Sequence, residues 1–144
     1  MPITIQRAPL PSLIQRLAEP RRFVQVVAGP RQVGKTTLVR QALAALAAQP
    51  QGHRLAQHSV SADAPGSQPA VWLSIQWEVA RALAAQAGAC VLVLDEVQKI
   101  PNWTESVKRL WDEDTAAGRD VRVVVLGSAP LLIARGLTES LAGR

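Results

Sequence analysis

Eight residues near the start of the chain have the types and spacing of a phosphate-binding loop, in the pattern Gly29-x-x-x-x-Gly34-Lys35-Thr36. The two glycines allow backbone conformations in which successive N–H groups turn toward phosphate oxygens. Lys35 would bring a positive charge to the β- and γ-phosphates, and the Thr36 hydroxyl is a hard oxygen ligand suited to Mg²⁺. The pattern therefore predicts a binding site for a nucleotide.

The segments on either side of this loop support that prediction. An apolar run at 23–28 precedes the loop, and an alanine- and leucine-rich segment typical of a helix, 34–48, follows it. The order strand, loop, helix distinguishes a working phosphate loop from a chance match, and a helix N-terminus attracts anions. A glycine turn before a basic helix is the alternative. The residues assigned to nucleotide binding are Gly29, Pro30, Arg31, Gln32, Val33, Gly34, Lys35, Thr36 and Thr37.

A second apolar run, 90–94, ends in two acids, Asp95 and Glu96. Next to a bound nucleotide, Asp95 would hold Mg²⁺ directly or through water, as would the Thr36 hydroxyl. Glu96 would orient and deprotonate the attacking water. A strand can also end in acids simply because loops are polar. The phosphate loop about sixty residues upstream is what favours the metal and base roles.

A third apolar run, 121–126, is followed by Ser128. Its hydroxyl could hydrogen-bond the γ-phosphate or the attacking water, and a serine in a turn is the alternative. Phosphoryl transfer also gains from an arginine that contacts the transferred group. Arg135 and Arg144 are candidates for that role, and each is equally explained as a surface charge. Arg31, inside the phosphate loop, could contact phosphate or face the solvent.

The alternation of apolar strands with helical segments predicts an α/β fold. The three apolar runs are nearly continuous, as parallel strands covered on both faces are. We therefore expect a three-layer, doubly wound sheet, in which ligands bind beyond the carboxyl ends of the strands. Further helices are predicted at 12–18 and 69–86 and from an N-cap at Asn102 that forms a capping box with Glu105, with a short strand at 59–62.

Length and composition fit a single domain of 144 residues, with an N-terminal segment at 1–22 and a nucleotide-binding core at 23–144. The 48% of apolar residues argues against disorder. No apolar run approaches a membrane span or a signal peptide, so we expect a cytoplasmic protein. Cys90 is expected as a small buried hydrophobe, and Trp72 and Trp77 as core residues. His53 and His58 are expected at the surface or in loops.

Basic residues are concentrated near the N-terminus of this chain of net charge +5. The first forty residues hold one acid, Glu19, and seven bases: Arg7, Arg16, Arg21, Arg22, Arg31, Lys35 and Arg40. A basic surface can indicate a nucleic-acid partner. A polyphosphate site explains the charge as well, and no recognition helix, zinc site or aromatic stacking platform accompanies it. Nucleic acid is thus a partner we do not favour.

Four stretches in order, 29–38, 94–103, 126–129 and 135–144, resemble a group of prokaryotic predicted ATPases. This group belongs to the AAA+ superfamily and carries a C-terminal domain of unknown function. The resemblance covers most of the chain and implies ATP as the nucleotide, Mg²⁺ as the metal and Glu96 as the base. It also implies that Ser128 occupies the position called sensor 1, and that the chain is an ATPase domain.

Members of that group continue past the stretch matching 140–144 with a further strand, a lid and a large C-terminal domain. We therefore expect a partial AAA+ domain here, in which the strand beside 23–28 and a second-sensor arginine are missing. Residues 3–6, a protein partner or a second copy would cover that open edge. Three activities stay open: ATP hydrolysis, a nucleotide-dependent switch with negligible hydrolysis, and a nucleic-acid-associated ATPase. A small-molecule kinase ranks last, because tandem acids fit water activation better.

Overall fold

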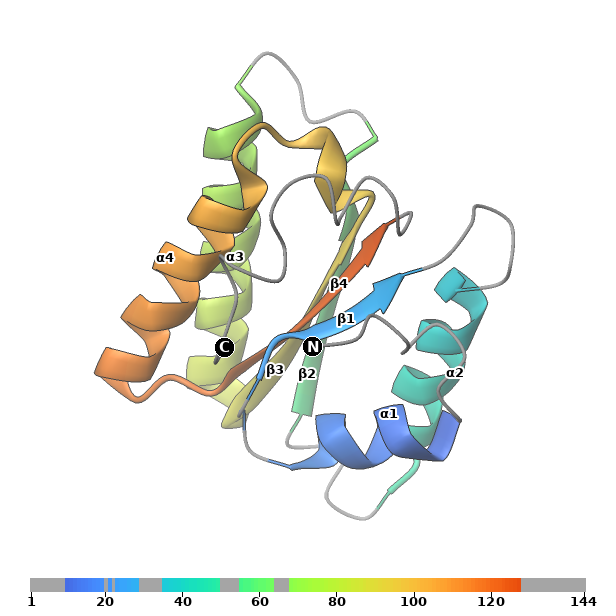
Figure 1. The fold of residues 1–144 in the computed structure, drawn as a ribbon. Coiled ribbons are helices and arrows are strands. Elements are labelled where there is room, and N and C mark those ends of the chain that lie inside the picture. The colour runs from blue at the N-terminus through green and yellow to red at the C-terminus, as the bar shows by residue number, and fades with distance from the viewer. Residues whose placement is uncertain are drawn as a thin grey trace.

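The computed structural model describes residues 10–19, 21, 23–28, 35–49, 55–63 and 68–127. Strands and helices alternate along these residues, as predicted (Figure 1). The elements in order are α1 (Leu10–Ala18), β1 (Gln25–Ala28), α2 (Lys35–Ala47), β2 (Leu55–Ser61), α3 (Pro69–Ala87), β3 (Ala89–Asp95), the 3₁₀ helix η3 (Val97–Lys99), α4 (Trp103–Ala117) and β4 (Val121–Gly127).

The four described strands form one parallel sheet in the order β1-β4-β3-β2. The register aligns Ala28 of β1 with Gly127 of β4. It also aligns Ser61 of β2 with Asp95 of β3. All four strands therefore end at the same edge of the sheet, and β4 lies between β1 and β3.

Helices cover both faces of this sheet, with α3 and α4 on one side and α1 and α2 on the other (Figure 1). Successive residues of a strand point to opposite faces. Thus Cys90, Leu92 and Leu94 join the buried cluster formed with α3 and α4. Val91 and Val93 join the cluster formed with α1 and α2. This two-sided burial accounts for the nearly continuous apolar runs of the sequence and confirms the predicted three-layer sheet.

The second strand is longer than predicted. The sequence places it at 59–62, but β2 spans Leu55–Ser61 and pairs with β3 along that whole length. Within the described sheet β2 lies at an edge and is only partly buried, so polar residues are tolerated along it and the apolar signal is weak. His58 is therefore a half-buried strand residue, and its Nε2 lies 2.9 Å from Oε1 of Gln76 on α3. His53 lies outside the described residues.

The predicted capping box at the start of α4 is wrong. Asn102 has φ 56° and ψ 33°, and its side chain makes no capping hydrogen bond. An N-cap side chain reaches the helix amides from the extended region of backbone space, which this left-handed conformation does not provide. The predicted helix ends are confirmed, since Gly88 ends α3 with φ 106° and Gly118 ends α4 with φ 72°. Both values lie in the region where glycine is favoured.

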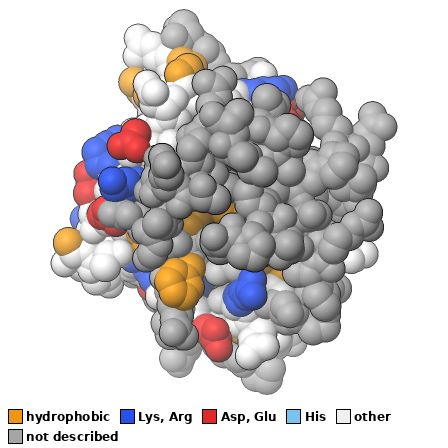
Figure 2. Space-filling view, in the orientation of Figure 1, with side chains coloured by type: hydrophobic (Ala, Val, Ile, Leu, Met, Phe, Trp, Pro, Cys, Tyr) orange, Lys and Arg blue, Asp and Glu red, His pale blue; other side chains and the backbone are white. Residues whose placement is uncertain are grey.

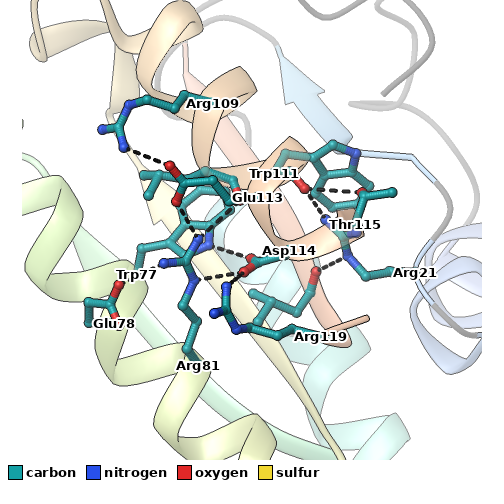
Figure 3. Close-up of polar contacts among 12 residues, drawn as sticks. Arg21, Trp77, Glu78, Arg81, Arg109, Trp111, Glu113, Asp114, Thr115 and Arg119 are labelled. Atoms are coloured by element: carbon teal, nitrogen blue, oxygen red, sulfur yellow. Dashed lines mark hydrogen bonds and ion pairs between the residues drawn. The ribbon is translucent and has the colours of Figure 1, made fainter. Parts of the chain in front are cut away.

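A buried carboxylate joins α3 to α4 (Figure 3). The Asp114 side chain is 0% exposed and accepts hydrogen bonds from Trp77 Nε1 and Arg81 Nε, each at 2.7 Å. Arg119 Nη1 donates a third at 3.1 Å. Burial lowers the pKa of the Arg81 guanidinium, but hydrogen bonds with Glu113 and the charge of Asp114 raise that pKa overall, so the cation persists. Trp77 is fully buried here, as expected of a core residue.

Arg21 ties the segment before β1 to the far end of α4 (Figure 3). Its guanidinium carbon lies 3.5 Å from the centroid of the Trp111 ring, a cation–π contact. It also donates to the Val121 carbonyl at 2.9 Å and to the Thr115 hydroxyl at 2.6 Å. Partial burial lowers the pKa of Arg21 below its usual value despite nearby acids. This arginine is therefore committed to the fold and does not add to a basic surface.

The outer surface of the helices carries both charged and apolar side chains. Figure 2 shows acidic and basic side chains intermixed on the side where α4 lies, and an Arg109–Glu113 pair at 3.3 Å belongs to that helix. Val71, Ile75 and Val79 are exposed on α3. Among the helices that the structure describes, none is both long and apolar enough to cross a membrane.

Replacing Asp114 by alanine should lower the free energy of unfolding by about 3–5 kcal/mol, because it leaves Arg81 and the Trp77 N–H without their buried acceptor. Urea denaturation would measure the change. Glu113→Ala is the matched control, since this carboxylate binds the same arginine from the solvent side and should have a much smaller effect. Equal losses in the two variants would contradict a central role for Asp114.

Cys90 should be inert in the folded protein. The thiol is fully buried, and burial raises its pKa to about 11. Because the thiolate is the reactive form, a disulfide reagent at about pH 8 should leave the native protein unmodified and label the urea-unfolded chain fully. Labelling of the native protein at the unfolded rate would contradict this burial.

Candidate nucleotide site

The first half of the predicted site is described only where α2 begins. Residues 29–34 of the loop lie outside the described residues, as do Ser128, Arg135 and Arg144. The backbones of Lys35 and Thr36 form the start of α2, and Thr37 is exposed one residue later. The roles assigned to these side chains stay predictions.

The elements around the loop have the predicted arrangement. β1 ends at Ala28, and α2 begins at Lys35. The loop therefore leads from the carboxyl end of a strand to the N-terminus of a helix of 13 residues. At the N-terminus of a helix, unpaired amide groups and the positive end of the helix dipole favour anions, so the position of α2 is compatible with the predicted phosphate site.

The acids at the end of β3 lie at the same edge of the sheet. Asp95 is the last residue of β3 and is partly exposed, and its carbonyl accepts a hydrogen bond of 2.9 Å from the Ala62 amide. Only β4 separates β3 from β1. Adjacent strands are about 4.8 Å apart, so the ends of β1 and β3 are separated by roughly 10 Å. The ends of β1, β4 and β3 therefore lie together at the sheet edge beyond which the sequence predicts ligand binding.

Glu96 starts a turn and does not extend the strand. Its φ of 56° and ψ of 35° are left-handed, a conformation that few residues other than glycine adopt. The turn continues into η3, where the Lys99 amide donates to the Glu96 carbonyl at 3.0 Å. On the side chain, Glu96 Oε1 accepts a hydrogen bond of 2.8 Å from Gln98 Nε2. Asp95 and Glu96 thus have different backbone settings, which suits two different roles.

Sequence reasoning missed three polar residues beside these acids. Gln98 is buried within η3, and Lys99 forms an ion pair with Asp63 just past the end of β2. The Ser61 hydroxyl also donates to Asp63, at 3.1 Å. Asp63 escapes prediction because the sequence signal for β2 is short and poorly defined. The polar residues that follow a strand are the signal that could have found it.

The donor at the end of β3 fits magnesium. Mg²⁺ prefers oxygen ligands and is usually held by one or two protein groups, with phosphates and water completing the shell. The Asp95 carboxylate supplies such an oxygen at the sheet edge. In the part of the chain that the structure describes, no group of three or more His, Cys, Asp or Glu side chains could hold a metal on its own. A site completed by a nucleotide is consistent with both observations.

A family model decides the relationship. The model described as an AAA domain matches residues 21–144. The chain belongs to the AAA domain family. Its α/β sheet is thus that of a nucleotide-binding AAA domain, and the predicted membership of the AAA+ superfamily is confirmed. No curated protein matches the chain significantly.

Two solved structures from Aeropyrum pernix share the fold of this AAA domain. The ORC1 protein in complex with DNA has a TM-score of 0.68 at 18% identity, over 99% of this chain and 44% of its own. The ORC2 protein in ADPNP–ADP complexes has a TM-score of 0.56 at 16% identity, over 94% and 43%. The AAA domain therefore spans less than half the length of either protein. At such identities the likeness confirms the P-loop NTPase fold alone.

Proposed function

We propose that this AAA domain binds ATP with Mg²⁺ and hydrolyses the ATP, alone or with a protein partner. The observation that carries the proposal is the meeting of three features at one sheet edge. These are the connection from β1 to α2, the end of β4, and the Asp95-Glu96 pair at the end of β3. Phosphoryl transfer to water needs an anion site, a metal ligand and a base within reach of one another.

Each residue of the proposed site has a distinct task. The loop amides and Lys35 hold the phosphates, Thr36 and Asp95 would hold the metal, and Ser128 hydrogen-bonds the γ-phosphate or the water. When bound, Mg²⁺ supplies positive charge that neutralises the phosphate oxygens. Glu96, turned away from the strand direction, accepts the proton of the attacking water.

Lys35→Ala should weaken binding of a non-hydrolysable ATP analogue by about 10- to 100-fold, because it removes a charged donor to the phosphates. Isothermal titration calorimetry with Mg²⁺ present would measure the affinity. Lys108→Ala on α4 is the matched control, since it removes the same charge elsewhere and should bind as the wild type does. Equal affinities of wild type and Lys35→Ala, or binding by neither, would refute the nucleotide site.

Glu96→Gln should reduce the rate of phosphate release at saturating ATP by about 10²- to 10⁴-fold, because an amide cannot accept the proton from water. Analogue binding should persist, since the side chain keeps its size. Phosphate release and analogue titration on the same preparations would separate the two steps. Equal, near-zero rates in both proteins would instead favour a nucleotide-dependent switch.

Partners of this AAA domain rank below the nucleotide. Within the described sheet, β1 is paired only with β4, so a protein partner or a second copy beside β1 remains part of the proposal. Nucleic acid is less favoured than the sequence suggested, because the contacts of Arg21 with Trp111 and β4 remove it from the basic set. Arg16 and Arg40 are exposed and remain available. A cytoplasmic location stays a prediction.

A further inference from the structure

Gln98 holds the side chain of Glu96 by a hydrogen bond made within one turn. The left-handed backbone of Glu96 turns the chain into η3 and brings residues 96 and 98 alongside each other. Gln98 Nε2 then donates to Glu96 Oε1 at 2.8 Å. A hydrogen bond that involves an ionised acceptor is stronger and more directional than one between neutral groups. The bond therefore restricts the orientation of the carboxylate.

The remainder of the Gln98 side chain is poorly suited to a stabilising role. The residue is only 7% exposed, and in the described part of the chain its buried Oε1 has no hydrogen-bond partner. A buried polar atom without a partner costs about 1–3 kcal/mol. An apolar side chain of similar shape would avoid this cost, so stability does not account for an amide here. The contact with Glu96 does account for it.

We propose that Gln98 is a positioning residue that orients the Glu96 carboxylate toward the attacking water. This inference rests on the proposed role of Glu96 as base. The amide donates to one carboxylate oxygen and thereby restricts rotation of the group. The Ile100 amide donates to the Val97 carbonyl at 3.0 Å and closes the turn that contains Gln98. In this role Gln98 acts through Glu96 and not on the nucleotide directly. Its effect is therefore on turnover and not on binding.

Gln98→Met tests this role, because the methionine side chain has a similar length and no N–H donor. We expect kcat for ATP to fall about 10- to 100-fold, the loss typical of a misplaced reacting group. KM and the affinity for the ATP analogue should stay at wild-type values. The midpoint of thermal unfolding should stay the same or rise. Unchanged kcat would overturn the proposal. A lower unfolding midpoint with weaker analogue binding would also overturn it, because Gln98 would then be structural.

Gln25→Met is the matched control for this substitution. Gln25 is likewise buried, at 9% exposed, and its Nε2 donates one hydrogen bond of 3.0 Å to the Phe23 carbonyl. It lies at the start of β1, away from the acids. Its kcat should equal that of the wild type. If Gln25→Met lost as much kcat as Gln98→Met does, the proposal would be overturned. The loss would then follow from replacing any buried glutamine.

A spectroscopic measurement separates failure of this inference from failure of the proposed hydrolysis. If the wild type binds the ATP analogue but releases no phosphate, hydrolysis by this chain is refuted and the contact can still be tested. The side-chain amide ¹⁵N–¹H signals of Gln98 should then shift in Glu96→Gln and stay in place in Glu105→Gln, which changes an exposed carboxylate of α4. If the Gln98 amide signals do not shift in Glu96→Gln, the positioning role is overturned.

Discussion

The polar groups of the candidate site reach one place because all four described strands run in the same direction. Each parallel strand requires a crossover to the next, and the helices of those crossovers cover the sheet on both faces. β3 and β4 are therefore buried along nearly their whole length, and polar side chains gather where the strands stop. The buried apolar residues thus lie along each strand, and the polar residues that could bind a ligand lie at its end. The register of the sheet decides which of these polar groups become neighbours.

The three buried strands β1, β3 and β4 were predictable, and the reason is the same two-sided burial. Nearly continuous apolar runs such as 23–28, 90–94 and 121–126 are typical of strands that are covered on both faces, and each is too short for a buried helix. β2 is only partly buried, with partly exposed and exposed residues along its length, so its sequence carries no comparable signal. The order of β4 between β1 and β3 follows from packing between distant segments, which no local pattern records.

The sequence indicates candidate residues for the site but not the geometry in which they lie. Asp95 and Glu96 stand out because they follow an apolar run, and the structure brings them to the edge beside Gly127. The left-handed backbone of Glu96 and the bond from Gln98 depend on a 3₁₀ turn that sequence patterns do not specify. A glutamine after a strand looks like an ordinary loop residue. The failed cap at Asn102 has the same origin, because the turn between η3 and α4 sets its conformation.

The carboxylate of Asp114 also has a consequence for how this sequence can diverge. One acceptor group serves three donors, from Trp77, Arg81 and Arg119. Replacing any one donor leaves part of the buried charge of Asp114 uncompensated. Replacing Asp114 first leaves the three donors without their acceptor. Relatives are therefore expected to keep the whole set or to have exchanged it for an apolar one, with few intermediates surviving between the two. Because of this contact between α3 and α4, the residues at positions 77, 81, 114 and 119 are expected to change together in evolution.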